Sequence, residues 1–96
     1  MKKKGESALI KLFGSISRAR ILLLFFKNPQ QSFYQREIMF ETGLSLQAVQ
    51  RELKNLRALG ILEKRETAAR VYYQICQTSY FFQPLRQICD ETVDIL

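Results

Sequence analysis

The sequence predicts a mainly α-helical fold with one small β-hairpin, and three observations support this prediction. Apolar residues recur at helical spacing over 46–59 and again over 84–96. β-branched and aromatic residues alternate over 71–76, which is typical of a strand with one buried face. Gly43 and Gly60 stand where helices commonly end. The chain of 96 residues, 47% of them hydrophobic, therefore predicts one domain with a single core, spanning 1–96.

Two helices are expected in the N-terminal part of the chain. The first covers 6–13 and ends at Gly14. Ser15 or Ser17 can cap the second helix, which runs to the break before Pro29. This second helix is apolar nearly all round, so we expect it to be largely buried.

Residues 35–59 have the layout of a helix-turn-helix. A short helix over 35–42 ends at Gly43, and Ser45 can cap a longer helix that runs to residue 59. The longer helix has one apolar stripe and an opposite face on which every residue can donate a hydrogen bond. The stripe consists of Leu46, Val49, Leu53 and Leu56, and the polar face of Gln47, Gln50, Arg51, Lys54 and Arg57.

A β-hairpin is expected next, over 61–76, and we call it the wing. Its strands cover 61–66 and 71–76. At most a very short strand is expected before the hairpin, at 32–34, and a last helix is expected over 84–96. The order of helix, helix, helix, hairpin and helix is that of a winged helix-turn-helix. Basic residues flank the tip of the hairpin, namely Lys64, Arg65 and Arg70.

The polar face of the longer helix fits the chemistry of double-stranded DNA. A major groove admits one α-helix, where glutamine can pair with adenine and arginine with guanine. Lys54 and Arg57 can neutralise phosphates. The alternative is a generic helical hairpin with a solvated polar face. The position of Glu52 toward the apolar edge, the basic hairpin and the placement of the Ser45 cap weigh against that alternative.

The formal net charge of +6 suits a polyanionic partner, although a basic chain end can also serve solubility alone. Residues 1–36 carry eight lysines and arginines and one glutamate, whereas residues 71–96 are net acidic. The longest apolar run, 21–26, is too short for a membrane span or a signal peptide. We therefore expect a cytoplasmic protein without a membrane partner.

Catalytic, metal-binding and cofactor-binding patterns are not found in the sequence. There is no histidine, no glycine-rich phosphate loop and no nucleophile beside a plausible base, so an enzyme is not expected. Cys76 and Cys89 are thirteen residues apart, and we interpret both as buried small apolar residues in a reducing compartment. A redox switch is the alternative, but nothing basic stands beside Cys89.

The run REIMFETGLSLQAVQRELKNLRALGILEKRE, followed by RVYYQI, resembles the winged helix-turn-helix of ArsR- and MarR-type regulators. The segments LFGSISRARILLLFF and SFYQREI are similar to stand-alone winged-helix proteins that are associated with nucleotidyltransferases. Together the resemblance covers residues 9–77. It implies sequence-specific binding of double-stranded DNA by a homodimeric transcription regulator that acts as a repressor. It also leaves an alternative, a protein-interaction module that serves as an antitoxin-like partner of a nucleotidyltransferase.

The resemblance also implies roles for individual residues. In the family pattern Ser45, Gln47, Gln50 and Arg51 face the groove, Arg36 touches the backbone, and Arg70 is the wing arginine. The chain departs from the pattern at Met39, where a small alanine is usual, and at Phe40, where a charged residue is usual. Phe40 is either a lone surface apolar residue or a partner contact. Metal sensing is not expected, because the longer helix lacks the Cys-x-Cys pair of the metal sensors.

The two terminal helices, 6–13 and 84–96, are the candidate dimer interface. Regulators of this kind generally bind two half-sites one helical turn apart, which requires two subunits. The alternative is that these helices pack onto the core of their own chain. The residues expected at the interface are Leu9, Leu12, Phe13, Leu85, Ile88, Val93 and Leu96, with Ile10 on the same stripe.

Overall fold

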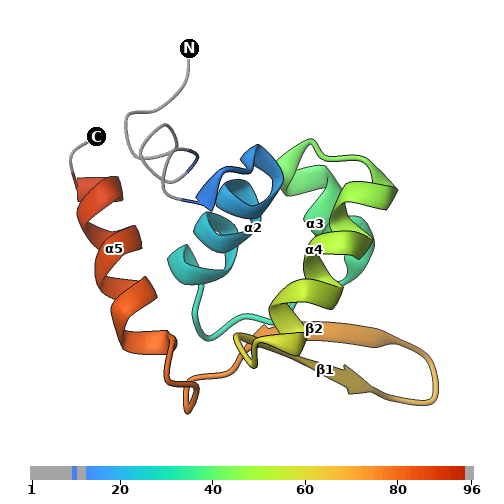
Figure 1. Ribbon diagram of the computed structural model, residues 1–96. Coiled ribbons are helices and arrows are strands. Elements are labelled where there is room, and N and C mark those ends of the chain that lie inside the picture. Colours follow the sequence, from blue (N-terminus) through green and yellow to red (C-terminus); the bar gives the residue numbers. More distant parts are fainter. Residues whose placement is uncertain (1–9, 11–12, 95–96) are drawn as a thin grey trace.

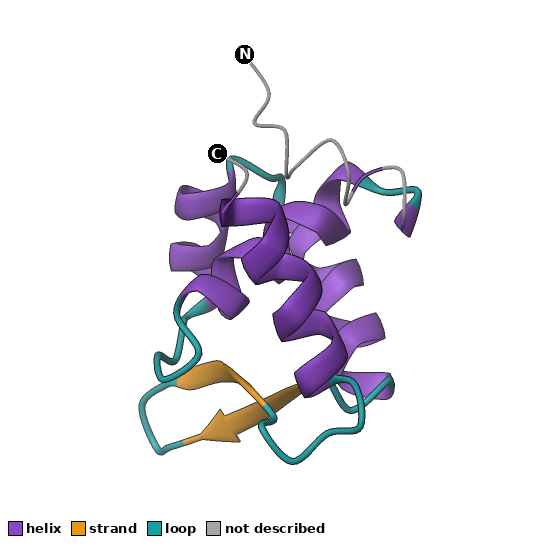
Figure 2. Ribbon diagram, turned by 90° about the vertical axis from the view of Figure 1, so that its left-hand side faces the viewer, coloured by secondary structure: helices purple, strands orange, loops and turns teal. Residues whose placement is uncertain are grey.

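The computed structural model describes residue 10 and residues 13–94, with side chains up to residue 90. The helices pack together, and the hairpin extends along one end of the helical layer (Figures 1 and 2). Because the hairpin leaves from the end of α4, the helix and the wing share one side of the molecule. In chain order the elements are α2 (Ile16–Lys27), α3 (Gln35–Thr42), α4 (Leu46–Ala58), β1 (Leu62–Glu66), β2 (Val71–Ile75) and α5 (Phe82–Asp94).

Helix α2 is the centre of the fold and contacts α3, α4, α5 and β2. Ser15 caps its start, since its hydroxyl accepts a hydrogen bond of 3.1 Å from the backbone N–H of Arg18. Its end is closed by Asn28, whose side-chain amide donates to the carbonyl of Leu24 at 2.8 Å. The prediction that this helix is largely buried is confirmed by Ala19, Ile21, Leu22, Phe25 and Phe26, which all lie in the core.

The turn between α3 and α4 follows the predicted pattern. Gly43 ends α3 in the left-handed conformation, at φ 72°, and its N–H donates to the carbonyl of Met39 at 2.8 Å. Ser45 then caps α4 by accepting a hydrogen bond of 3.2 Å from the N–H of Ala48. The helix-turn-helix is therefore confirmed, with boundaries at Gln35–Thr42 and Leu46–Ala58.

We expect Gly43→Ala to lower the free energy of unfolding by about 1–2 kcal/mol, the cost of a left-handed conformation for an L-residue. The added methyl group would meet nothing within 4 Å, so the effect comes from the backbone alone. Gly43→Asn should cost less, since asparagine tolerates this conformation. Urea denaturation of the three proteins measures the differences. Equal stability of the alanine variant and the original chain would contradict this account of the turn.

The hairpin pairs antiparallel, with Leu62 opposite Ile75 at one end and Glu66 opposite Val71 at the other. Its tip is the predicted turn over 67–70, closed by a hydrogen bond of 2.8 Å from the N–H of Thr67 to the carbonyl of Arg70. The very short strand expected at 32–34 is present as an isolated bridge. Phe33 bridges Tyr73 through two backbone hydrogen bonds of 2.8 Å each. The wing is thereby tied to the segment that enters α3.

Helix α5 is held to α2 by aromatic and aliphatic packing. The rings of Phe26 and Phe82 stack with centroids 5.8 Å apart, and Leu85 and Cys89 are buried beside them. Burial raises the pKa of the Cys89 thiol to about 12, with a smaller contribution from the charge of Asp90. Cys89 is 2% exposed and is thus buried, as predicted.

Several predicted boundaries and burials are corrected by the structure. Helix α5 begins at Phe82 rather than Pro84. Proline is tolerated inside the first turn because backbone N–H groups there have no partner within the helix, so the missing N–H breaks no hydrogen bond. Strand β1 begins one residue after Ile61. Leu46 is 39% exposed, since it is the first residue of α4 and only the later members of the stripe reach the core. Cys76 is half-buried rather than buried.

The residues expected at a dimer interface are only partly described. Leu85 is 7% exposed and belongs to the core of its own chain, so its assignment to a dimer surface is corrected. Ile10, Phe13 and Ile88 are partly buried against the same core, as in the alternative of intrachain packing. The other members of the set, which are Leu9, Leu12, Leu96 and the side chain of Val93, lie outside the described residues.

In the part of the chain that the structure describes, no helix has the length and apolar character needed to cross a bilayer.

Candidate nucleic-acid interface

Helix α4 carries an exposed polar face on the side opposite the core. Val49, Leu53 and Leu56 are buried and hold the helix to the rest of the domain. Because side chains three and four positions apart share a helix face, the polar residues between them point outward together. The exposed polar residues of α4 are the five predicted ones, Gln47, Gln50, Arg51, Lys54 and Arg57, with Ser45 exposed at the cap. Leu46 and Ala58, at the two ends of the helix, are exposed as well.

The acidic residue of α4, Glu52, is withdrawn from this exposed face. It is only 2% exposed, and its carboxylate accepts a hydrogen bond from Arg18 Nε of α2 at 2.7 Å. Arg51 Nε lies 3.5 Å from the other carboxylate oxygen. A buried carboxylate requires such partners, because removing it from water without them costs several kcal/mol. The pair therefore ties α4 to α2 and leaves the exposed face of α4 without a carboxylate.

Arg18 is a residue of this site that the sequence analysis missed. The position of Glu52 at the edge of the apolar stripe was a signal that a cation must lie nearby. The sequence could not say which cation, since Arg18 and Glu52 are 34 residues apart. The side chain of Arg18 is 29% exposed, so part of it reaches the surface.

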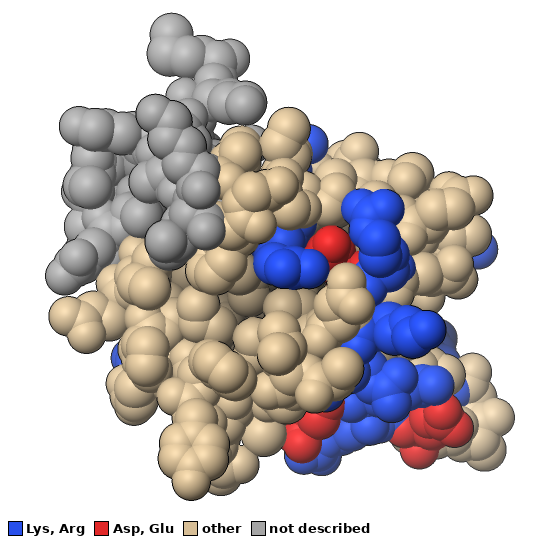
Figure 3. Space-filling model, in the orientation of Figure 1, with Lys and Arg blue, Asp and Glu red and all other residues tan. Residues whose placement is uncertain are grey.

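A basic surface continues from α4 onto the first strand of the wing. Lys54, Arg57 and Lys64 line one hollow, together with Ala58, Leu62 and Glu63. Figure 3 shows lysines and arginines gathered over α4 and the hairpin, whereas the visible surface over α5 carries few charges. The structure thus brings the two predicted phosphate-binding residues, Lys54 and Arg57, together with Lys64 of the wing.

Two acidic residues of β1 offset part of this charge. Lys64 pairs with Glu66 at 2.9 Å, and Arg65 pairs with Glu63 at 3.5 Å. The hydrogen bond from Lys64 and its charge hold the pKa of Glu66 below its usual value, and the charge of Arg57 contributes less. Since these pairs are solvent-exposed, each holds its partner only weakly. Lys64 and Arg65 are therefore placed at the surface, but each faces a carboxylate of its own strand.

Arg70 lies at the wing tip but folds back onto the residue that precedes α3. Its guanidinium donates a hydrogen bond to the hydroxyl of Tyr34 and lies over the Tyr34 ring, 4.9 Å from the centroid. The Tyr34 ring also packs against Tyr72 of β2, with centroids 4.6 Å apart. Arg70 is thus held against the helix-turn-helix rather than projecting from the tip.

Electrostatic effects in this cluster follow from its hydrogen bonds. Hydrogen bonding with Tyr72, and then with Arg70, lowers the pKa of Tyr34 below its ordinary value. The hydrogen bond with Tyr34 raises the pKa of Arg70 and, within the tyrosine pair, raises that of Tyr72. Arg70 therefore keeps its positive charge at any physiological pH. Sequence analysis missed both tyrosines, because their meeting depends on the pairing of β2 with the segment before α3.

Arg36 is exposed in the first turn of α3. It lines a hollow with Arg70, whose other lining residues are Tyr34, Gln35, Ala69 and Val71. The two arginines that were predicted to contact a nucleic-acid backbone therefore border the same depression of the surface.

Phe40 is 85% exposed on α3. This exposure was expected, because a charged residue usually stands at this position in the family that the sequence resembles. It borders a third hollow, which is lined also by Gln31, Phe33, Tyr34, Arg36, Glu37 and Glu41. Met39 is partly buried against the core.

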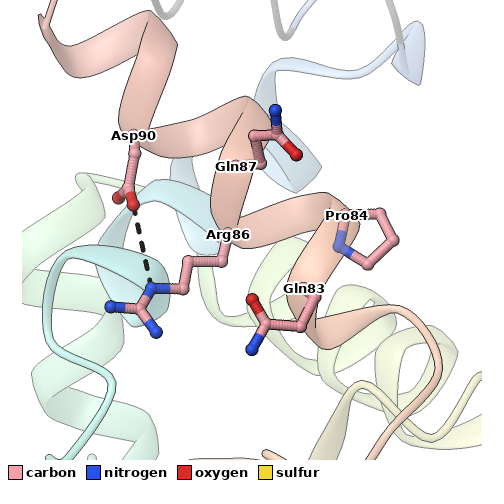
Figure 4. A pocket seen from close by; sticks show the side chains of 5 residues that line it. All are labelled: Gln83, Pro84, Arg86, Gln87 and Asp90. Carbon is pink, nitrogen blue, oxygen red and sulfur yellow. Dashed lines mark ion pairs between the residues drawn. The ribbon is translucent and has the colours of Figure 1, made fainter.

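A further hollow lies on α5 and has a different character. Figure 4 shows Arg86 reaching toward Asp90, one helical turn away, at a distance of 3.8 Å. Gln83, Pro84 and Gln87 complete its lining. Because its arginine is paired within the helix, this surface provides matched control positions for the basic surface of α4. Within the described residues no group of three acidic, cysteine or histidine side chains is placed to hold a metal ion.

In the described part of the chain, α2 packs with the helix-turn-helix formed by α3 and α4, and a two-stranded wing and α5 follow; this arrangement defines a winged helix, an α+β fold. No family model matches the chain, and no curated protein matches its sequence. A similar solved structure is the crystal structure of the predicted DNA-binding transcriptional regulator from E. coli. Its TM-score is 0.69 at 23% identity, over 94% of this chain and 87% of that chain. At this identity the likeness supports the fold.

Proposed function

We propose that the protein is a DNA-binding transcription regulator that places α4 in a major groove. One observation carries this proposal: every exposed polar side chain of α4 is a hydrogen-bond donor or a cation, because Glu52 is buried against Arg18. A carboxylate on that face would repel phosphate and restrict base contacts. The function named for the similar structure from E. coli is consistent with the proposal.

In this proposal, residues near the start of α4 contact base edges. Gln47, Gln50 and Arg51 lie in its first two turns, where a recognition helix usually meets the bases. Ser45 Oγ already accepts the capping hydrogen bond, so Ser45 would contact DNA by donating its O–H or through the backbone. The phosphate contacts would come from the two basic hollows and the wing, with Lys54, Arg57, Lys64, Arg65, Arg36 and Arg70.

We further propose a homodimer that acts as a repressor. A single helix contacts only a few base pairs, so two subunits on an inverted repeat would be needed for specificity. Tyr80 and Phe81, in the turn just before α5, are 98% and 45% exposed, so a single subunit leaves this aromatic surface uncovered. A second subunit at this end of the molecule would cover it.

The experiment is a selection from a random duplex library at low and moderate salt, with the bound DNA sequenced. We expect an inverted repeat whose half-sites are about one helical turn apart. On the selected duplex, Lys54→Ala should make the plot of log affinity against log salt shallower by about 0.9, one phosphate contact.

The matched control for this experiment is Arg86→Ala, which removes an exposed cation of α5. It should leave the salt slope unchanged. If the wild-type protein retained no DNA even at low salt, the proposal would be wrong.

A second candidate function is a protein-interaction module, such as an antitoxin-like partner of a nucleotidyltransferase. The specific observation in its favour is Phe40, 85% exposed beside a hollow that is not basic overall. Apolar docking at Phe40 should depend little on salt, whereas phosphate contacts weaken steeply as salt rises. The same salt series therefore distinguishes the two functions.

A further inference from the structure

The segment that enters α3 is joined to strand β2 at three successive residues. The middle pair is a backbone bridge, and the outer pairs are side-chain hydrogen bonds of 3.2 Å each. Because the segment continues directly into α3, the wing and the helix-turn-helix are connected through space as well as along the chain. The pairs are Ser32 with Gln74, Phe33 with Tyr73, and Tyr34 with Tyr72.

Tyr34 is the member of this segment that also contacts the wing tip. It accepts a hydrogen bond from Arg70 and places its ring beneath the guanidinium. A free arginine side chain on a hairpin tip samples many rotamers, and ordering it on binding costs about 0.5–1.5 kcal/mol. Since Tyr34 already orders the side chain, less of that cost remains when a ligand binds.

The ordered guanidinium remains able to bind an anion. It carries five N–H donors, of which the contact with Tyr34 uses one. It borders the hollow that Arg36 also lines, so two cations face the same depression. Glu37 weakens the positive potential, but its carboxylate accepts a hydrogen bond of 2.8 Å from the N–H of Tyr34. A phosphodiester of a DNA backbone matches this pair of forked donors in charge and geometry.

We infer that Tyr34 is a positioning residue for DNA binding: together with Tyr72 it holds Arg70 beside Arg36, so that both arginines contact the same stretch of backbone. The inference rests on the proposed function and adds to it a residue that contacts no base. It also gives the wing a defined place, because the Arg70 contact and the bridge at Phe33 hold the hairpin against the start of α3.

The first test is Tyr34→Phe, which removes the hydroxyl and keeps the ring. On a duplex that the wild-type protein binds, affinity should fall about fivefold, the loss of one well-placed hydrogen bond. The control is Gln87→Ala, which truncates an exposed polar side chain of α5 and should leave the affinity unchanged.

The second test is a double-mutant cycle with Arg70→Ala. If Tyr34 acts through Arg70, Tyr34→Phe should cause no further loss of affinity once Arg70 is removed. A purely structural role of Tyr34 would instead reduce affinity by the same factor in both backgrounds. Additive losses would therefore overturn the inference. Arg70→Lys retains the charge but not the planar fork, and it should bind more weakly than wild type if the positioned guanidinium matters.

The controls also separate this inference from the proposed function. If the wild-type protein binds DNA and Tyr34→Phe binds equally well, the positioning role is wrong and the proposed function stands. If the wild-type protein binds no DNA at low salt, the proposed function and the positioning role are both wrong. Thermal unfolding of each variant checks that the folded state is retained. If Tyr34→Phe does not fold, the DNA affinity of Arg70→Lys provides the test instead.

Discussion

Replacing Arg18 with methionine should lower the free energy of unfolding by about 3 kcal/mol. The substitution leaves the Glu52 carboxylate buried and removes its hydrogen bond of 2.7 Å from Arg18. We place the effect at the lower end for a broken buried pair, because Arg51 remains 3.5 Å away and Arg18 is itself partly exposed. Urea denaturation at neutral pH measures the change.

The double variant Arg18→Met/Glu52→Leu should recover most of that loss. Replacing both members of a buried ion pair with apolar side chains of similar size is often neutral. Recovery would show that the cost arises from an unpaired carboxylate and not from lost packing of the Arg18 stem.

The control for the pair is Arg86→Met, which breaks the exposed ion pair with Asp90 on α5. It should change stability by less than about 0.5 kcal/mol, as exposed pairs usually do. If Arg18→Met were no more destabilising than Arg86→Met, the contact between α2 and α4 would not have the role given to it here.

The second large effect concerns DNA sequence preference. Arg51→Ala should lower affinity for the selected duplex about tenfold to a hundredfold, the loss expected for an arginine that reads a base edge. Arg51 suits this role because its side chain is 60% exposed on the second turn of α4. Its loose contact with Glu52 orients the guanidinium while leaving donors free for a base.

The comparison that separates base contact from phosphate contact uses a scrambled duplex. Arg51→Ala should weaken binding to the selected sequence far more than to the scrambled one. Arg65→Ala, on the exposed strand of the wing, should weaken both alike. Gln87→Ala on α5 is the neutral control for side-chain truncation. Equal loss on both duplexes for Arg51→Ala would mean that Arg51 contacts only the backbone.

The helices and turns were predictable because their signals are local. Ser15, Gly43 and Ser45 each act on hydrogen bonds within four residues of themselves, so their positions in the sequence are sufficient. The polar face of α4 was equally predictable, since it follows from helical spacing alone. Boundaries were less certain, as the start of α5 two residues before Pro84 shows.

The burial of single residues was harder to predict. Leu46 continues the apolar stripe of α4 in sequence, but it lies at the first residue of the helix and remains exposed. Leu85 belongs to an amphipathic stripe that could cover the core or a second subunit, and the structure places it in the core. Periodicity identifies which face of a helix is apolar, but what covers that face depends on the packing of distant elements.

The sequence by itself determined the winged-helix order, the turn at Gly43 and the set of side chains on the outer face of α4. Only the tertiary structure decided which side chains pair with Glu52 and with Arg70. Arg18 reaches Glu52 across 34 residues, and Arg70 reaches Tyr34 across 36. Local backbone preferences act over a few residues, whereas a buried charge or a stacked arginine takes whichever partner the packing of α2, α4 and the wing brings near.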